Sequence, residues 1–323
     1  MNFTGTSYDI SCRQFCYRRE TIRCALRHYY YKLYIIENKM LNFGNEVPSR
    51  NAPAPGAPGV GLRSVHYPYL LEHTDLRIQW FEAISENYMD SKGRPLFMLE
   101  HIRKNFPLAL HGVSLSAGSA DGISPEYVRR LKALVDRVEP FLVSDHLAWT
   151  RIDGQNLHDL LPLPCTQEAL EIFCANLNQA QDILGRNIAI ENPSTYLAFR
   201  QSEMPEWEFL VRAAKNCSTG ILLDINNIFV SASNHGFDPR EYIEAVPSEL
   251  VRQMHLGGHT DMGTHLFDTH SRPVTDEVWD LFTFAARKFH QAPILIEWDE
   301  DIPEFTRVEE EALKAGAILR SFQ

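Results

Sequence analysis

The chain has 323 residues and a formal net charge of −11. This length suits one large domain, because a single α/β barrel commonly uses about 250 residues. The acidic balance argues against nucleic-acid binding, since such proteins usually present a basic face to the phosphates. The sequence contains no apolar run of about 18 residues, so we expect a soluble protein without a membrane span.

The cysteines follow no metal-binding or disulfide pattern. Three precede the expected domain and three are scattered through it, and none shows the paired CxxC spacing of a zinc site. We therefore expect reduced thiols and a cytoplasmic protein. The six positions are Cys12, Cys16, Cys24, Cys165, Cys174 and Cys217.

Residues 1–58 differ in composition from the rest of the chain. The stretch PSRNAPAPGAPG, residues 48–59, holds too much proline for a helix or a central strand and is typical of a linker. The residues before it lack the apolar run and the cleavage site of a secretory signal, and Met40 is a candidate start. We expect residues 1–58 to be a disordered N-terminal extension with a linker, and residues 59–323 to form the catalytic domain.

From Gly59 onward the chain repeats one unit, a short apolar strand followed by a helical stretch. Two of the helices carry clear start signals, Ser124 followed by Pro125 and Thr166 followed by Glu168. The expected strands are 59–63, 80–85, 107–113, 141–147, 187–193, 220–227, 252–258 and 292–299. Eight strands alternating with helices predict parallel pairing and closure into a single (β/α)8 TIM barrel, of class α/β.

Histidines and carboxylates recur near the C-terminal ends of these strands. The positions are His111, Asp145, His146, Glu191, Asp224, His255 and Glu297. Barrel enzymes build their active sites at this face, from several strands at once. A carboxylate among apolar neighbours is costly to bury unpaired, and these strands hold hardly any Lys or Arg. The convergence of such groups favours bound cations over structural ion pairs.

The stretch Val251–Val274 has the highest density of such residues. It contains four histidines and two aspartates, which are His255, His259, His265, His270, Asp261 and Asp268. Neutral imidazoles and carboxylates are good ligands for divalent metals. The alternative is that these histidines are simply solvated in a polar loop, and we assign His259 and His265 to the loop or to positions behind the ligands.

At these residues the chain resembles the xylose-isomerase-like barrels, which include endonuclease IV. The matching positions are His111, Asp145 or His146, Glu191, Asp224, His255, Asp268-x-His270 and Glu297. One position departs from the endonuclease, because Asn227 stands where that enzyme has a histidine. The exchange of an imidazole for an amide argues against a DNA-repair zinc site.

A closer resemblance spans nearly all of residues 59–320. The motifs GVGLR, SENY, LHGVSLS, SDHLAW, IENPSTY, LLDINN, HLGGH, DTH and LIEWD occur in this order. Together they are similar to those of the multinuclear non-haem iron-dependent oxidative enzymes, which include the oxidases of methanobactin and thiaglutamate peptide biosynthesis. So many motifs in one order identify the family far better than the substrate.

The resemblance implies two or three irons with a mixed-valent Fe(II)/Fe(III) pair, and O₂ as co-substrate. The expected reaction is oxidation of cysteine in a ribosomally made precursor peptide, which a small partner protein presents by its leader segment. The implied metal positions are His66, His111, Asp145, His146, Glu191, Asp224, Asn227, His255, Asp268, His270 and Glu297. Among these, Asp145, Glu191 and His255 are the expected catalytic residues, and Glu86, Asn192 and Trp149 are expected to contact the substrate.

Two other functions stay open at this point. A metal-dependent sugar isomerase or an endonuclease-IV-like hydrolase would use the same barrel, but no catalytic lysine or basic rim stands out. A non-catalytic metal-binding protein would take up metal without consuming O₂. The long connection 150–165 is a candidate wall of the peptide channel, and its alternative role is a plain surface loop.

Overall fold

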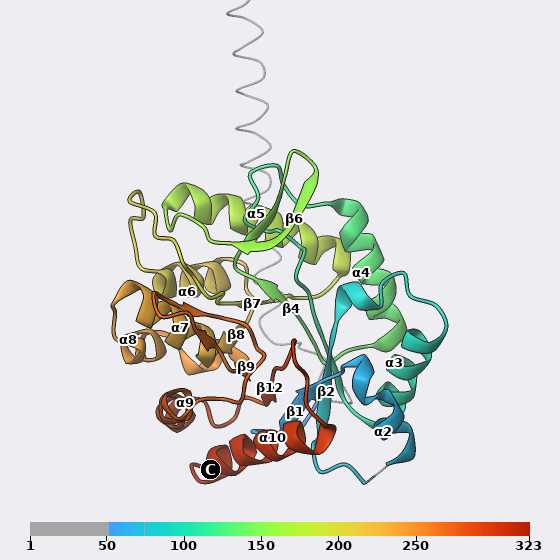
Figure 1. Cartoon of the computed structure of the whole chain (residues 1–323). Coiled ribbons are helices and arrows are strands. Elements are labelled where there is room, and N and C mark those ends of the chain that lie inside the picture. The colour runs from blue at the N-terminus through green and yellow to red at the C-terminus, as the bar shows by residue number, and fades with distance from the viewer. Residues whose placement is uncertain (1–51, 74) are drawn as a thin grey trace, which may run out of the picture. The chain divides into compact units, whose positions relative to one another are not determined.

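A computed structural model describes residues 52–73 and 75–323. Its centre is a closed barrel of eight parallel strands in the order β1-β12-β9-β8-β7-β4-β3-β2 (Figure 1). The strands are β1 Pro58–Gly61, β2 Trp80–Ile84, β3 Leu108–His111, β4 Leu142–His146, β7 Ala189–Glu191, β8 Ile221–Asp224, β9 Val251–Leu256 and β12 Ile294–Ile296. The predicted TIM barrel is confirmed. Residues 1–51, including Met40 and the first three cysteines, lie outside the described residues.

The barrel interior changes from apolar to polar along its axis. Ala57, Trp80, Ala109 and Leu295 form a small buried cluster near the N-terminal ends of the strands. Side chains two residues apart on a strand share a face, so the next inward positions are Glu82 after Trp80, His111 after Ala109 and Glu297 after Leu295. The apolar layer thus closes the bottom of the barrel and carries a polar layer above it.

Helices cover the outside of the barrel (Figure 1). They are α2 Tyr67–Glu72, α3 Arg94–Asn105, α4 Pro125–Val138, α5 Gln167–Leu184, α6 Glu206–Asn216, α7 Ile225–His235, α8 Pro239–Ala245, α9 Asp276–Phe289 and α10 Phe305–Arg320, with short 3-10 turns η1 Ser64–His66, η2 Ser85–Asn87 and η3 Ser248–Leu250. The expected caps are present, because Ser124 accepts a hydrogen bond from the Tyr127 amide and Thr166 from the Ala169 amide.

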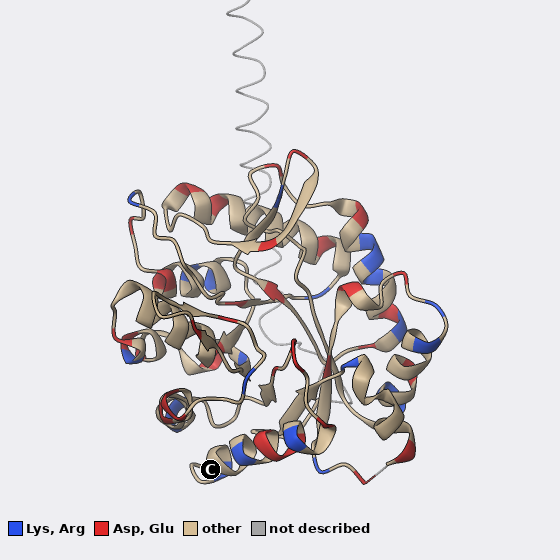
Figure 2. Ribbon diagram, in the orientation of Figure 1, with Lys and Arg blue, Asp and Glu red and all other residues tan. Residues whose placement is uncertain are grey.

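The charged residues of the described chain are mixed over the outer surface. Figure 2 shows Lys and Arg on the outer helices, interspersed with Asp and Glu, as along α10. No helix among the described residues is long and apolar enough to cross a bilayer.

The sixth expected strand ends earlier than predicted. We expected strand 220–227, but β8 ends at Asp224 and helix α7 begins at Ile225. The cause is the Asp224 side chain, whose Oδ1 accepts a hydrogen bond of 2.6 Å from the Asn227 amide and caps the helix. Asn226 and Asn227 therefore lie on the first turn of α7.

The long connection 150–165 is more ordered than a plain loop. It contributes most of an antiparallel hairpin, formed by β5 Trp149–Ile152 and β6 Gln155–Leu161. Asp153 and Gly154 make its turn with φ of 50° and 74°, values that favour an Asp-Gly pair. A second, smaller hairpin joins β10 Thr260–Asp261 to β11 Leu266–Phe267.

The last residues of the expected linker pack against the barrel. The Ala57 side chain is buried, its carbonyl accepts a hydrogen bond of 2.9 Å from the Trp80 indole, and the Gly56 amide donates to the Gln291 carbonyl at 3.1 Å. Gly56 has a φ of 66°, and a Cβ there would lie 2.9 Å from the His290 carbonyl oxygen, so a larger residue would be strained. The ordered contacts thus begin slightly before Gly59.

Candidate metal centre at the C-terminal end of the barrel

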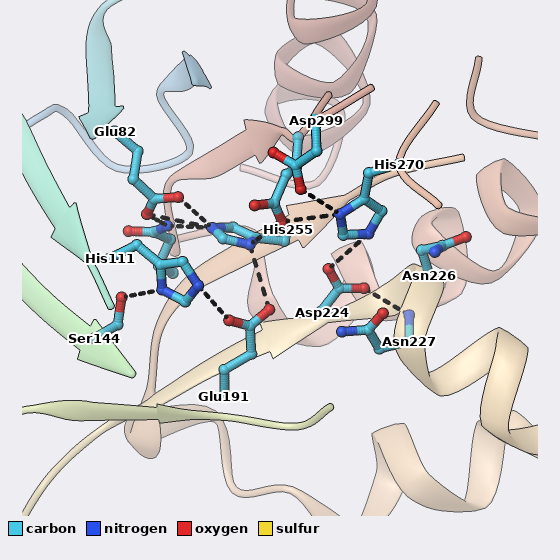
Figure 3. Close-up of polar contacts among 12 residues, drawn as sticks. Glu82, His111, Ser144, Glu191, Asp224, Asn226, Asn227, His255, His270 and Asp299 are labelled. Atoms are coloured by element: carbon cyan, nitrogen blue, oxygen red, sulfur yellow. Dashed lines mark hydrogen bonds and ion pairs between the residues drawn. The ribbon is translucent and has the colours of Figure 1, made fainter. Parts of the chain in front are cut away.

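Three overlapping groups of imidazoles and carboxylates lie at the C-terminal ends of the strands. Figure 3 shows six of their members, His111, Glu191, Asp224, His255, His270 and Asp299. Within each group, one ligand atom of every residue lies within 4.8 Å of the others. The first group is His111, His146 and Glu191; the second is Glu191, Asp224, His255 and Glu297; the third is His270, Glu297 and Asp299. Because Glu191 and Glu297 each belong to two groups, the three positions are neighbours in one continuous site.

The first group joins β3, β4 and β7. The Nε2 atoms of His111 and His146 lie 3.2 Å and 3.3 Å from Oε2 of Glu191. The other ring nitrogen of His146 is 3.2 Å from the Gly112 carbonyl oxygen, which can only accept a hydrogen bond. The Nδ1 atom therefore carries the proton, and Nε2 offers its lone pair toward Glu191. Burial also lowers the pKa of His146, which keeps its imidazole neutral.

The second group is centred on His255 of β9. Its Nδ1 atom lies 3.0 Å from Oε2 of Glu297 and 3.4 Å from Oε1 of Glu191. On the other side of the ring, Nε2 lies 3.1 Å from Oε1 of Glu82 and 2.7 Å from Nε2 of Gln253. A carboxylate behind an imidazole fixes the ring orientation and raises the basicity of the nitrogen that faces a metal.

The third group is built by the loop after β11. The Nδ1 atom of His270 lies 3.4 Å from Oε2 of Glu297 and 3.3 Å from Oδ2 of Asp299, and its Nε2 atom lies 2.9 Å from Oδ1 of Asp268. His270 has a φ of 44°, in the left-handed region that is costly for residues with a side chain. Its ring packs on Gly257, where a Cβ would lie 2.3 Å from the His270 Cδ2 atom. The backbone at His270 is therefore locally strained in the conformation that directs its imidazole toward the site.

Asp268 and its neighbours border the third group. Oδ1 of Asp268 accepts a hydrogen bond of 2.8 Å from Asn226, whose own amide oxygen lies 2.9 Å from Nδ1 of His259. The Asp268 amide donates to the Tyr196 hydroxyl at 3.0 Å. His259 thus stands behind Asn226, as expected for a residue outside the ligand set, and Asp268 contacts His270 directly.

Several buried polar atoms of the site have only imidazole–carboxylate contacts and form no well-oriented hydrogen bond among the described residues. They are both carboxylate oxygens of Glu191, Oδ2 of Asp224, Nδ1 of His255 and Nε2 of His270. Such atoms are costly to bury without a partner, and native proteins satisfy nearly all of them. These atoms face the shared centre, so cations fit the groups that these residues form.

The electrostatics of the site also fit bound cations. Burial raises the pKa of Asp224 to about 8, with Glu191 and Asp268 adding to the shift and His270 opposing it. Burial opposes protonation of His255, but Glu82, Glu297 and Glu191 outweigh it, and the pKa of His255 rises well above its ordinary value. Without metal the excess negative charge is thus offset by protons, which a cation would displace.

The two candidate ligands on the fourth strand have different surroundings. His146 belongs to the first group, whereas the Asp145 carboxylate accepts hydrogen bonds from the His146 amide at 2.8 Å and the Leu115 amide at 3.1 Å. Burial, with Glu86 adding, raises the pKa of Asp145 to about 7. Adjacent residues of a strand point to opposite faces, so Asp145 and His146 face different surroundings. Asp145 holds the loop after β3 through the Leu115 amide.

Two other expected metal positions, His66 and Asn227, are not members of the three groups, and their metal roles stay predictions. His66 lies outside the three groups, and its Nε2 atom faces the Pro303 carbonyl oxygen at 2.8 Å. Because that oxygen only accepts, Nε2 is the donor, whereas the Nδ1 atom is buried without a hydrogen-bond partner. The Asn227 side-chain nitrogen donates to the Asn192 carbonyl at 3.1 Å, which leaves its buried Oδ1 atom without a partner.

The expected substrate contacts already bond within the protein. Oε1 of Glu86 accepts from the Val113 amide at 2.9 Å and from the Tyr127 hydroxyl at 2.6 Å. The Asn192 side chain makes two hydrogen bonds with the backbone of Asp224, and the Trp149 indole donates to the Pro162 carbonyl. These three side chains therefore hold loops and strand ends, and a direct substrate contact by any of them remains a prediction.

Sequence reasoning missed four residues that support the site: Glu82, Gln253, Arg63 and Asp299. Glu82 was detectable as the single charge within the apolar strand WFEAI, residues 80–84. Asp299 was detectable because it follows Glu297 by two residues and so shares its face in an extended segment. Arg63 donates to the Trp298 carbonyl at 3.0 Å and pairs with Asp299, while Nη2 lies 3.8 Å from Glu297. No local sequence pattern indicated these contacts of Arg63.

Fold and site together define a TIM barrel with a candidate multinuclear metal centre at its catalytic face. The family described as "RiPP precursor modification enzyme MbnB/TglH/ChrH" matches residues 57–320, and the chain belongs to this family. This confirms the family resemblance found in the sequence, and it makes the chain a member of an enzyme family that acts on peptide precursors.

Relatives of this chain carry a name without a stated activity. A UPF0276 protein of Caulobacter vibrioides is 51% identical over 245 residues, which cover 76% of this chain and 88% of that protein. A UPF0276 protein of Rhizorhabdus wittichii is 50% identical over 254 residues, which cover 78% and 91% of the two chains. These matches support the family and leave the substrate open.

Solved structures with this fold include sugar epimerases. A D-psicose 3-epimerase in the presence of D-fructose aligns with a TM-score of 0.52 at 14% identity, over 82% of this chain and 99% of that chain. A D-tagatose 3-epimerase-like protein aligns with a TM-score of 0.50 at 16% identity, over 82% and 96%. Likeness at this identity shows the barrel fold alone and carries no information on the reaction.

Proposed function

We propose that this protein oxidises cysteine residues in a ribosomally made precursor peptide, using iron and O₂. The observation that carries the proposal is the continuous site in which Glu191 and Glu297 are shared among three groups of ligands. Its donors are imidazole nitrogens and carboxylate oxygens, a set that suits iron or manganese as well as zinc. Membership of a family of precursor-modifying enzymes supports a peptide substrate.

Two or three irons would be held by the three groups, as a mixed-valent set. When bound, they supply O₂ activation and a place for the cysteine sulfur of the peptide to bind. In this assignment Glu191 lies between the first and second positions, facing His111 and His146 with one oxygen and His255 with the other. Glu297 lies between the second and third positions, where its Oε2 atom faces both His255 and His270.

The surrounding residues orient these side chains. Glu82 holds the far nitrogen of His255, Ser144 lies 2.9 Å from Nδ1 of His111, and the Gly112 carbonyl fixes His146. Asp145, expected as a catalytic residue, acts on the backbone of the loop after β3. Catalysis would thus depend on Glu191 and His255 directly, and on Asp145 through its support of that loop.

Peptide access is assigned to the rim around the metal centre. The β5–β6 hairpin exposes Ile152 and Leu157, and the strand Gln155–Leu161 is largely solvent-exposed. Exposed apolar residues on a free strand edge suit contact with an extended peptide or with the protein that presents it. We assign the reaction to the cytoplasm, with a small leader-binding partner protein and without nucleic acid or membrane.

The test combines metal analysis with peptide chemistry. Protein purified without oxygen should contain two to three irons per chain on the family precedent, and with a cysteine-containing precursor, its presenting partner and O₂ it should change the peptide mass. The change should disappear with a Cys→Ser peptide and with Glu191→Gln. Stoichiometric zinc, with sugar epimerisation and no O₂ uptake, would instead support the isomerase. Bound iron with no O₂-dependent change in any cysteine-containing peptide encoded near its gene would support a metal-binding protein without this activity.

A further inference from the structure

Two cysteines lie together on the outer layer of the barrel, away from the metal centre. Cys174 is half-buried in the middle of α5, and Cys217 is buried at the C-terminal cap of α6. These two helices pack against each other (Figure 1). The Cys217 Sγ atom lies 3.9 Å from the carbonyl oxygen of Cys174, and neither residue forms a disulfide.

The backbone around the pair is held in place. The Cys217 amide donates to the Ala213 carbonyl at 3.0 Å, and the Gln181 side chain of α5 donates to the Cys217 carbonyl at 3.1 Å. The Gln181 side chain also accepts a hydrogen bond of 2.9 Å from the amide of Ile188, the residue before β7. Contacts that do not depend on the sulfur atoms therefore hold Cys217 beside α5, and its thiol lies next to Cys174.

The Cys174 thiol also differs in its pKa from that of Cys165, the third described cysteine. The hydrogen bond from Cys217, supported by Asn216, outweighs burial and lowers the pKa of the Cys174 thiol. Burial and the nearby Glu206 raise the pKa of Cys165 to about 12, and the Cys165 thiol faces the Leu163 carbonyl at 3.9 Å. Since the thiolate is the reactive form, Cys174 is more reactive than Cys165.

We propose that Cys174 and Cys217 form a site of reversible oxidation, at which hydrogen peroxide converts the two thiols into a disulfide that links α5 to α6. The Cys174 thiolate attacks one peroxide oxygen, which gives a sulfenic acid and hydroxide. The Cys217 thiol then attacks that sulfur, the S–S bond forms and water leaves. In total two thiols lose two electrons and two protons, and one peroxide becomes two waters.

The proposed link has a structural consequence for the segment that it encloses. Residues between the two cysteines include β7 and the loop after it, hence Glu191 and Asn192 of the site. A disulfide around this segment restricts the unfolded chain and stabilises the folded one. Neither cysteine belongs to the three metal groups, so the link leaves the ligands in place.

The test treats reduced full-length protein with a small excess of hydrogen peroxide, blocks the remaining thiols and maps the peptides. Digestion after glutamate separates Cys165 from Cys174 at Glu168 and Glu171, so the two can be told apart. We expect a linked peptide joining Cys174 to Cys217, lighter by two hydrogens and released by dithiothreitol. Cys174→Ser and Cys217→Ser should abolish it, and Cys165→Ser should retain it.

A second measurement checks the consequence of the link. The melting temperature of oxidised wild-type protein should rise by about 5 °C over the reduced form, and the rise should be absent in Cys174→Ser. Metal content should be equal in the two forms. The proposal is overturned if peroxide oxidises Cys174 only to sulfinic acid, if the linked peptide never forms, or if Cys165 links to Cys217 as readily.

Discussion

Glu82 of β2 lies directly behind His255 of β9, with Oε1 of Glu82 3.1 Å from Nε2 of His255. The opposite ring nitrogen faces Glu191 and Glu297. Glu82, which is far from His255 in the chain, therefore orients the His255 ring so that its Nδ1 atom points into the metal centre.

The first prediction concerns this pair. Glu82→Gln keeps the shape of the side chain but removes its negative charge, so the His255 ring loses the carboxylate that orients it. Loss of such a partner typically lowers metal affinity by about 10- to 100-fold. Chelator competition with iron-loaded protein measures this affinity, and Glu310→Gln at an exposed position of α10 is the matched control. Equal affinity in the two variants would show that Glu82 has only a packing role.

A second prediction concerns Arg63. Its guanidinium group pairs with Asp299 and lies near Glu297, so it holds both carboxylates of the third group. In Arg63→Met these carboxylates lose their fixed orientation, and we expect loss of the ion bound with His270 while the first group keeps its metal. Elemental analysis should show about one ion fewer per chain, with unchanged circular dichroism. Arg63→Lys should restore part of the loss, and a full complement of metal in Arg63→Met would contradict the assignment.

The third prediction separates the two neighbours on β4. His146→Ala removes an imidazole from the first group and should lower metal content with little effect on unfolding of the metal-free protein. Asp145→Asn leaves that imidazole in place but turns an amide group toward the amides of His146 and Leu115. It should lower the free energy of unfolding by about 1–3 kcal/mol, while metal still binds. Urea denaturation and elemental analysis of both variants decide this, and the reverse pattern would make Asp145 the ligand.

The fourth prediction concerns pH. Because the pKa of His255 is raised well above its ordinary value in the metal-free site, its imidazole carries a proton at neutral pH. Metal binding must displace that proton, so affinity should rise with pH, by up to about tenfold per pH unit for each proton displaced. Calorimetric titration with Mn²⁺ in buffers of different ionisation enthalpy counts the protons released. An affinity that is constant across neutral pH would contradict the protonated state.

The fifth prediction concerns the beginning of the ordered chain. A protein that starts at residue 52 retains the described contacts and should keep its stability and its metal. Removing residues up to Ala57 as well leaves the Trp80 indole without its acceptor and opens the bottom layer of the barrel. An unpaired buried donor costs about 1–3 kcal/mol, which thermal unfolding of the two chains can resolve. Equal melting temperatures would show that this segment is only a linker.

The sequence by itself determined the barrel and the positions where ligands cluster. Alternating apolar strands and helices indicate the number and direction of the strands, and polar residues near the strand ends converge because parallel strands end at one face. That reasoning depends only on local pattern, which is why Glu191, His255 and Glu297 were identified together.

Tertiary structure alone decided how those side chains are held. Asp145 and His146 are adjacent in sequence, and the pairing of β4 with its neighbours selects the one that faces inward. The contact of Glu82 with His255 and that of Arg63 with Asp299 join opposite parts of the chain. Such contacts form only when the barrel closes between β1 and β12 and so brings the first and last strands together. Sequence periodicity describes one strand at a time and carries no record of that closure.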